Sequence, residues 1–320
     1  PYQDNKFKGV NIIHAYDPEY KIGTAGQFVY DLNCILDSRK AKFDVILQLG
    51  YTSSSVWFRL LPKKAIIVTN MDGMEWKRSK YSSSVRKFLM YAEKLAVKSS
   101  DFLISDSLGI QDYISKKYNR ASKYIAYGAT VFNTPNDKVL SKYNVDKNNY
   151  CVLIARLEPE NNIQTIVDGY NASDTPHSLI IFGALNDFGN KLQNKYINDK
   201  RIQFLGANYN QEDLNNLRFF SRYYFHGHSV GGTNPSLLEA MASNALIIAN
   251  NNIFNKSILE DNAHYFDNSN DIKEILNQDS LFAKKEIFAM ANINKINELY
   301  SWEIINSSYE NYIINKIKTT

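Results

Sequence analysis

The sequence of 320 residues contains little cysteine. Cys34 and Cys151 are its only two cysteines; they lie far apart, and neither has neighbours at the spacing of metal ligands. A disulfide scaffold and a cysteine-ligated metal centre are therefore excluded. Two free thiols favour a protein of a reducing compartment.

Long apolar runs are lacking as well. No stretch reaches the roughly 18 apolar residues of a membrane-spanning helix. The polar opening, residues 1–6 (PYQDNK), has no apolar core behind it, unlike a signal peptide. We therefore expect a cytoplasmic protein that at most makes peripheral contact with the inner face of the membrane.

Charge of one sign is not in large excess either. The chain has 37 Lys and Arg residues against 33 Asp and Glu, a net charge of +4, which does not indicate a nucleic-acid partner. Basic residues do gather between Lys77 and Lys98, a segment expected to be a helix with one apolar side. A solvated helix face is one interpretation of this segment, and peripheral contact with an anionic membrane is the other.

What the chain does contain is a repeated alternation of short apolar runs and helix-period segments. Its composition, 44% apolar and 22% charged, is that of a soluble globular protein, and 320 residues suffice for two domains. In the first half, strand-like runs fall at 10–13, 45–49, 65–69, 102–105 and 124–126, and helices are expected at 27–36, 83–98 and 108–117. This alternation predicts an α/β fold with a parallel sheet.

The polar stretch 132–138 interrupts the alternation, which then restarts. Strand-like runs follow at 150–154, 178–182, 202–205, 223–226 and 245–249, and helices are expected at 163–171, 211–220 and 235–242. We therefore predict two Rossmann-like domains, residues 1–133 and 134–295. A ligand cleft is expected between them, at the carboxyl ends of the strands.

The clearest candidate site is the loop and helix start at residues 231–239 (GGTNPSLLE). Glycines let a ligand approach the backbone, Asn234 is a good N-cap, and Pro235 suits the first helical position. Free amides at the helix start would bind phosphate, and Glu239 could reach a ribose hydroxyl. The same pattern also fits an ordinary strand–turn–helix.

Two further strand ends bring charged side chains toward the same cleft. Arg156 follows a predicted strand, where its guanidinium could grip a diphosphate in bidentate fashion. A surface salt bridge with Glu158 or Glu160 is the alternative. Asp72 follows another predicted strand and could orient a sugar hydroxyl or assist proton transfer, or simply form a turn with the glycine after it.

Three stretches together resemble the retaining glycosyltransferases of family 4, which have the two-domain GT-B fold. They are residues 70–80 (NMDGMEWKRSK), 155–162 (ARLEPENN) and 226–241 (HGHSVGGTNPSLLEAM). The likeness is greatest to the rhamnosyltransferase-like subgroup of capsule and O-antigen synthesis. It implies that the C-terminal helix, 296–320, packs back onto the first domain. It also implies that at least one βαβ-sized piece, of roughly 30 residues or more, is absent at the start, unless another segment takes its place, for which the glycine-rich residues 23–26 are the candidate.

The resemblance assigns roles by position. Arg156 would neutralise the departing diphosphate, Glu239 would hold the ribose and Asp72 would lie beside the sugar, so these three are the expected catalytic residues. The expected donor-binding residues are Asn161, Gly206, Ala207, Gly231, Gly232, Thr233, Asn234, Pro235, Ser236 and Leu237. The expected acceptor-binding residues are Gly23, Thr24, Trp76, Lys77 and Arg78. No catalytic metal or other cofactor is expected.

Three positions depart from the general family pattern. Gly231 stands where the first Glu of the E-x7-E motif is expected, Asn161 replaces a phosphate-binding Lys, and Asp72 replaces a His. The rhamnosyltransferase-like subgroup is similar in all three, so the departures indicate a different donor sugar rather than inactivity.

The expected activity is transfer of a sugar, with rhamnose as the first candidate, from a dTDP-, UDP- or GDP-linked donor. The expected acceptor is a glycan or lipid-linked saccharide in the synthesis of a bacterial cell-surface polysaccharide. A nucleotide-sugar-binding protein of the same fold without turnover is the alternative. A dinucleotide oxidoreductase is disfavoured because no G-x-G-x-x-G turn follows a strand.

Overall fold

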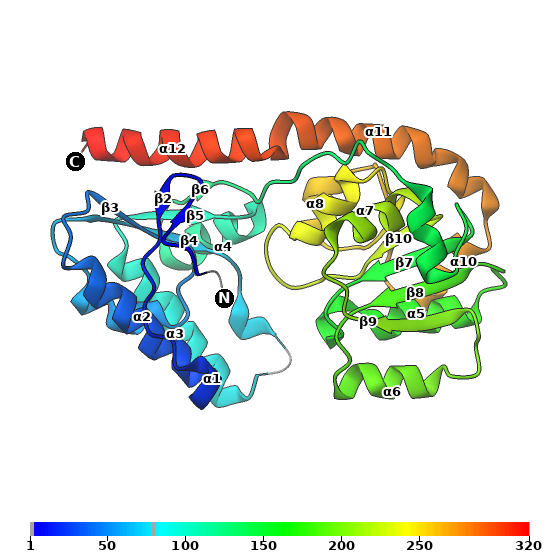
Figure 1. The fold of residues 1–320 in the computed structure, drawn as a ribbon, viewed down its shortest axis with the longest axis horizontal. Helices are drawn as coiled ribbons and strands as arrows, with labels where there is room; N and C mark the ends of the chain where they lie inside the picture. The colour runs from blue at the N-terminus through cyan, green and yellow to red at the C-terminus, as the bar shows by residue number, and fades with distance from the viewer. Residues whose placement is uncertain (1–2, 79–80, 320) are drawn as a thin grey trace.

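The computed structural model describes residues 3–78 and 81–319, and two α/β domains lie side by side along its long axis (Figure 1). The first domain contains a four-stranded parallel sheet in the order β3-β4-β5-β6. Its strands are β3 (Val45–Gln48), β4 (Ile66–Met71), β5 (Phe102–Ser105) and β6 (Lys123–Tyr124). The surrounding elements are α1 (Glu19–Ile22), α2 (Ala25–Ser38), the 3-10 helices η1 (Ser54–Leu60) and η2 (Glu75–Lys77), α3 (Ser83–Ser99) and α4 (Leu108–Tyr118).

The start of the chain differs from the prediction. The apolar run 10–13 predicts a buried parallel strand, but the structure has only a short antiparallel hairpin, β1 (Lys6–Phe7) and β2 (Val10–Asn11). Val10 is 66% and Ile13 63% exposed. The prediction was wrong because an apolar run becomes a sheet strand only where a neighbouring strand accepts its hydrogen bonds. Among the described residues, β3 pairs with β4 alone and forms the edge of the sheet.

The second domain contains a six-stranded parallel sheet in the order β12-β11-β10-β7-β8-β9. Its strands are β7 (Tyr150–Ile154), β8 (Ser178–Phe182), β9 (Ile202–Gly206), β10 (Tyr223–His226), β11 (Ile247–Asn250) and β12 (His264–Phe266). Its helices are η3 (Asp137–Tyr143), η4 (Pro159–Asn161), α5 (Ile163–Ala172), α6 (Asp187–Lys195), α7 (Gln211–Phe220), α8 (Pro235–Ala242), α9 (Ile253–Leu259), α10 (Ser269–Leu276) and η5 (Asp279–Lys284). The strand order reverses between β7 and β10, and such a switch point opens a crevice at the carboxyl ends of the strands.

Alternate residues of this sheet fill two separate cores. Tyr150 and Val152 face one core, whereas Cys151 and Leu153 face the other. Helices cover both faces, so the strands have to be apolar almost without interruption. This burial explains why the runs were readable from the sequence. It also shows that Cys151, which is fully buried, serves as a small packing residue.

The C-terminal segment spans both domains. Helix α11 (Lys285–Lys295) continues through the π-helical turn η6 (Ile296–Tyr300) into α12 (Trp302–Thr319), which runs over the first domain (Figure 1). There the Tyr312 hydroxyl donates to the Leu103 carbonyl at 3.5 Å, and the Tyr312 ring meets the Phe102 ring edge-on. Trp302 packs so tightly on Gly128 that a Cβ there would stand 2.7 Å from the indole.

The basic segment expected as one helix over 77–98 is divided. The turn η2 ends at Lys77, α3 begins at Ser83, and residues 79 and 80 lie outside the described part of the chain. The Ser82 side chain caps α3 by accepting the Val85 amide hydrogen, so the helix begins at Ser83, where the helix-period segment 83–98 predicts it. Within residues 3–78 and 81–319, no helix has the length and apolar character needed to cross a membrane.

Candidate active site

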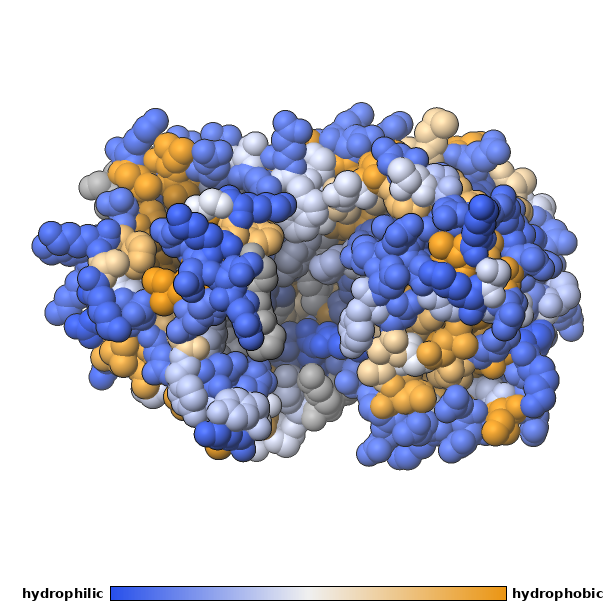
Figure 2. Space-filling view, in the orientation of Figure 1, coloured by the Kyte–Doolittle hydropathy of each residue, from blue (hydrophilic) through white to orange (hydrophobic). Residues whose placement is uncertain are grey.

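A cleft of about 450 Å³ lies at the carboxyl ends of β7, β8 and β10. We call it the switch-point cleft because β7 and β10 are the strands between which the sheet order reverses. The predicted site residues that line it are Arg156, Asn161, Ala207, Asn234, Pro235, Ser236 and Glu239. Figure 2 shows a hollow in the surface between the two domains.

Arg156 is the exposed cation of this cleft. It is the second residue after the end of β7, and its guanidinium forms no ion pair or hydrogen bond with any residue that the structure describes. The salt bridge with Glu158 or Glu160 that the sequence allowed is not formed. An unpaired guanidinium at a strand end is well suited to bind a diphosphate, which accepts two parallel hydrogen bonds from it.

Asn161 links Arg156 to His228. Its Nδ2 donates to the Arg156 carbonyl at 2.7 Å, and its Oδ1 lies 2.9 Å from His228 Nδ1. A carbonyl can only accept, so Oδ1 must face the histidine and Nδ1 must carry the proton. Both polar ends of Asn161 are therefore engaged inside the protein. In this structure Asn161 positions His228, and its predicted contact with the donor stays a prediction.

His228 is consequently held as a neutral imidazole whose Nε2 forms no hydrogen bond with the part of the chain that the structure describes. Burial, and then the charges of Arg78 and Arg156, lower the pKa of His228 to about 4. Its Nε2 faces the glycine loop, 3.5 Å from where a Cβ on Gly231 would stand. The imidazole can thus accept a hydrogen bond from a ligand hydroxyl at neutral pH.

The start of α8 differs in detail from a simple phosphate cradle. Pro235 has no amide hydrogen, the Ser236 amide donates to the Asn234 side chain at 2.9 Å, and the Leu237 amide donates to the Asn234 carbonyl at 3.0 Å. Leu237 is fully buried and lines neither cleft described here. These helical amides are already satisfied, so the dipole of the helix, rather than its first free donors, is what α8 contributes to an anion.

Glu239 is held by a buried arginine that the sequence did not reveal. Arg218 on α7 is 1% exposed, and its Nη2 lies 2.5 Å from Glu239 Oε2. The same guanidinium donates to Asn215 Oδ1, and Ser236 Oγ lies 3.3 Å from it. One edge of the Glu239 carboxylate is thereby fixed. The side chain is still 34% exposed toward the cleft and can bind a ligand there.

The far end of the switch-point cleft is formed by the segment after β9. Gly206 ends the strand with a positive φ of 78°, and Ala207, Asn208 and Tyr209 line the cleft behind it. The Asn208 amide donates to the Tyr143 hydroxyl at 2.8 Å, which anchors the turn. Tyr209 is 90% exposed, so a flat ring is available there for a ligand to stack upon.

A second pocket, of about 270 Å³, lies between the two domains and shares Arg156, His228, Asn234 and Pro235 with the switch-point cleft. We call it the interdomain pocket. Its remaining lining residues are Asp72, Gly73, Met74, Glu75, Arg78, Asp106, Tyr127, Val230, Gly231, Gly232 and Thr233. The predicted residues Asp72 and Arg78 of the first domain therefore meet the predicted glycine loop of the second.

The two domains touch at Asp106. The Thr233 hydroxyl donates to the Asp106 carbonyl at 2.5 Å. A Cβ added to Gly232 would stand 1.9 Å from the Asp106 carboxylate. Only glycine fits at that position, because any side chain would overlap the carboxylate from the other domain.

Burial perturbs both aspartates of this pocket. It raises the pKa of Asp72 to about 6, and burial together with the neighbouring charge of Asp72 raises the pKa of Asp106 to about 7. Carboxyl groups with such values can take up or release a proton near neutral pH. In the described residues, no three His, Cys, Asp or Glu side chains gather as metal ligands would.

Several predicted acceptor contacts lie elsewhere. Trp76 packs into the first domain, where its indole donates to the buried Glu93 carboxylate at 3.0 Å. Neither Trp76 nor Lys77 lines the two clefts. Gly23 and Thr24 form the turn between α1 and α2 and also lie outside both clefts.

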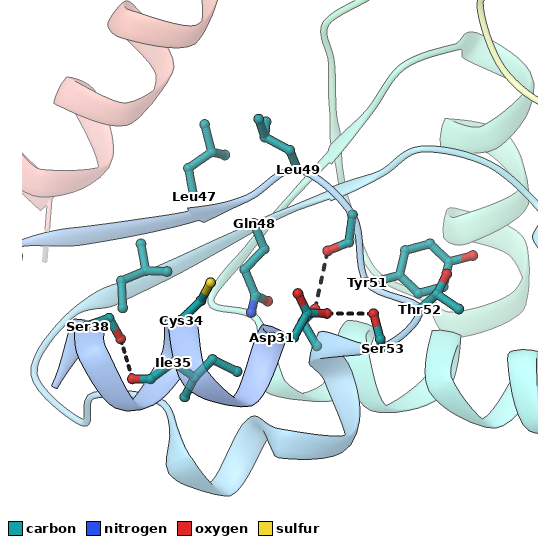
Figure 3. A pocket seen from close by; sticks show the side chains of 13 residues that line it. Asp31, Cys34, Ile35, Ser38, Leu47, Gln48, Leu49, Tyr51, Thr52 and Ser53 are labelled. Atoms are coloured by element: carbon teal, nitrogen blue, oxygen red, sulfur yellow. Dashed lines mark hydrogen bonds between the residues drawn. The ribbon is translucent and has the colours of Figure 1, made fainter. Parts of the chain in front are cut away.

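A third cavity, of about 430 Å³, lies beside the edge strand β3 in the first domain (Figure 3). Asp31 and Ser53 point toward each other in it, and the Ser53 hydroxyl donates to the carboxylate at 2.5 Å. Burial raises the pKa of Asp31. Among the residues predicted as sites, none lines this cavity.

Comparison with known proteins agrees with this architecture. Residues 54–130, which include Asp72 and Asp106, match a family model described as a domain of unknown function, DUF1972. No curated protein matches the chain in sequence. Among solved structures, HepE from Anabaena in complex with UDP-glucose has a TM-score of 0.75 at 16% identity, over 89% of this chain and 82% of HepE.

Two enzymes show the same arrangement. Sucrose-phosphate synthase from Thermosynechococcus elongatus has a TM-score of 0.74 at 15% identity, over 95% of this chain and 81% of its own. A glycosyltransferase from Rickettsia africae ESF-5 has a TM-score of 0.68 at 14% identity, over 96% and 84%. The chain has the GT-B fold. At such identities the likeness establishes the fold, and the activity has to be argued from the site.

Proposed function

We propose that the chain is a glycosyltransferase that moves a sugar from a nucleotide diphosphate sugar to a saccharide acceptor. The observation that carries this proposal is the unpaired Arg156, which lines the same cleft as Glu239 at the switch point of the second sheet. HepE, which has the same fold, binds UDP-glucose in its structure, and this supports a nucleotide sugar as the ligand class.

The two clefts would have different roles in this reaction. In the switch-point cleft, Arg156 would pair with the diphosphate, and Glu239 would accept a hydrogen bond from a ribose hydroxyl. As the bond from the anomeric carbon to the diphosphate breaks, Arg156 would stabilise the negative charge that develops on the leaving oxygen. The acceptor oxygen forms the new bond and releases a proton, which Asp72 on the wall of the interdomain pocket could receive.

The sequence resemblance extends this proposal. It supports retention of anomeric configuration without a catalytic metal or other cofactor, dTDP-rhamnose as the first donor to test, and a lipid-linked acceptor of capsule or O-antigen synthesis. It also supports a cytoplasmic location with peripheral contact at the membrane. The exposed basic side chains on α3, such as Lys87 and Lys94, would provide that contact.

The proposal is tested first by ligand binding. UDP, dTDP and GDP, and the corresponding nucleotide sugars, are added to the protein, and the unfolding temperature is measured. We expect at least one nucleoside diphosphate to raise it, because ligand that binds only the folded state stabilises that state. Release of the nucleoside diphosphate from the donor is then followed with lipid-linked saccharides as acceptors. Binding without release in the presence of any acceptor supports the alternative, a binding protein.

Arg156→Ala tests the site itself. We expect nucleotide affinity to fall about 10- to 100-fold, the scale of hydrogen bonds to a charged group. The unfolding temperature should change little, because the Arg156 guanidinium has no partner among residues 3–78 and 81–319. Arg39→Ala is the matched control, because Arg39 is also exposed but lies at the end of α2. Equal affinity of Arg156→Ala and the control would remove Arg156 from the site.

A further inference from the structure

The interdomain pocket has an acidic wall that the proposed reaction does not fully use. Met71 and Ser105 are register partners on the neighbouring strands β4 and β5. The residue that follows each strand is an aspartate, so Asp72 and Asp106 lie next to each other at the carboxyl end of the sheet. Both line the pocket, together with Glu75.

Asp106 has a buried oxygen without a partner. The residue is 2% exposed, and its Oδ1 accepts no hydrogen bond from any part of the chain that the structure describes. The carboxylate lies against Gly232, which belongs to the loop that closes the pocket from the other domain. A buried acceptor left unsatisfied is costly, so a donor from a ligand is expected at this atom.

The cations of the pocket do not neutralise this wall. Arg78 is engaged with Glu75 at 2.6 Å. Arg156 stands at the border with the switch-point cleft, where it would pair with the diphosphate. Asp72 and Asp106 form no ion pair with any described residue, so they present carboxyl groups to whatever occupies the pocket.

Resting on the proposed function, we propose that the interdomain pocket selects an uncharged sugar and excludes uronic acids and sugar phosphates, with Asp106 as the specificity-determining residue. Sugar hydroxyls donate hydrogen bonds and can satisfy Asp106 Oδ1. The carboxylate of a uronic acid, or a phosphate on the sugar, would lie against Asp72 and Asp106 and be repelled by like charge. The diphosphate itself is not affected, because it is bound at Arg156 outside the acidic wall.

The test compares matched ligands that differ only in this charge. UDP, UDP-glucose and UDP-glucuronic acid are titrated into the protein by calorimetry at pH 8. If GDP is the nucleotide that binds, GDP, GDP-mannose and GDP-mannuronic acid are used instead. If dTDP is the nucleotide that binds, dTDP, dTDP-glucose and dTDP-glucuronic acid are used. We expect the uronic acid to bind roughly 100-fold more weakly than the neutral sugar in the unaltered protein. Equal binding of the two nucleotide sugars would overturn the proposal.

Variants then test whether Asp106 is the residue that discriminates between the neutral sugar and the uronic acid. Asp106→Asn should reduce the ratio of the two dissociation constants at least tenfold, while the dissociation constant of the nucleoside diphosphate alone stays unchanged. Asp146→Asn, an exposed carboxylate of the second domain, is the control and should leave the ratio as it is. Asp72→Asn should act in the same direction as Asp106→Asn and serves in its place if that variant does not fold.

The outcomes separate the two proposals. If none of the nucleoside diphosphates binds, the proposed function itself fails, and this inference fails with it. If a nucleoside diphosphate binds but the ratio is the same in Asp106→Asn, in Asp72→Asn and in the unaltered protein, the function stands and the acidic wall has no part in specificity.

Discussion

The ion pair of Arg218 and Glu239 predicts that removing either partner destabilises the fold by a different amount. Arg218 is 1% exposed, whereas the Glu239 side chain is 34% exposed, and 2.5 Å separates Arg218 Nη2 from Glu239 Oε2. Glu239→Ala leaves a buried guanidinium with only neutral partners. Arg218→Met leaves a carboxylate that water can reach from the cleft. Glu239→Ala should therefore lower the free energy of unfolding more than Arg218→Met does.

The expected magnitudes follow from these exposures. Leaving one partner of a buried pair uncompensated costs about 3–5 kcal/mol, and we take the lower end, about 3 kcal/mol, because Glu239 is partly solvated. Arg218→Met should cost about 1 kcal/mol, the scale of a pair that water can replace. Adding Glu239→Ala to Arg218→Met should cost little more, since no buried charge is left behind. For a domain of this size, about 3 kcal/mol corresponds to roughly 6–12 °C in unfolding temperature.

Urea unfolding of the four proteins without ligand gives the measurement. The coupling free energy, which is the sum of the two single changes minus the double change, should be about 3 kcal/mol. Glu239→Gln is the control, because its amide oxygen can still accept from Arg218. The reasoning fails if Glu239→Ala is no more destabilising than Arg218→Met, or if the effects of the two substitutions simply add.

Three other outcomes follow from the same structure. Burial raises the pKa of Asp106 from 3.8 to about 7. The stability that Asp106 contributes is therefore fully present below about pH 4 and is lost as the pH rises through about 7. In urea unfolding, the free energy of unfolding of Asp106→Asn should rise relative to that of the unaltered protein between pH 5 and pH 8. Gly232→Ala would place a methyl group on the Asp106 carboxylate; it should separate the domains in small-angle scattering, and adding Asp106→Ala should restore the compact form. Glu93 is 1% exposed and accepts from Lys117 and from three aromatic side chains; Glu93→Ala should lower the free energy of unfolding by about 3 kcal/mol, because the donors around it lose their buried acceptor.

The fold was largely predictable because its signal is local. Each parallel strand is buried on both faces, so each appears in the sequence as a short apolar run between helical segments. The run 10–13 shows the limit of that rule. It has the same composition as a buried strand, yet it is exposed, because burial depends on a neighbouring strand that composition does not report.

The site was predictable to the extent that it lies at strand ends. Asp72 directly follows β4, and Arg156 is the second residue after β7, so the rule that ligands bind at the carboxyl ends of strands was enough to place both at clefts. Asp106 follows β5 in the same way and could have been found by the same rule. Arg218 could not, because it lies within α7, and only the packing of α7 against α8 brings it to Glu239.

Gly231 stands in place of the first Glu of the E-x7-E motif, and the structure shows that this substitution belongs with a different loop conformation. Gly231 has a φ of +121°, a conformation that a glutamate would adopt only with strain, so this loop shape and a Glu at 231 exclude each other. The loop turns instead toward the first domain, where Gly232 lies against the Asp106 carboxylate. A carboxylate is therefore still present beside the loop, but it comes from the opposite domain. Its distance from the loop then depends on how the two domains close, so the specificity proposed for Asp106 would be tied to closure of the cleft.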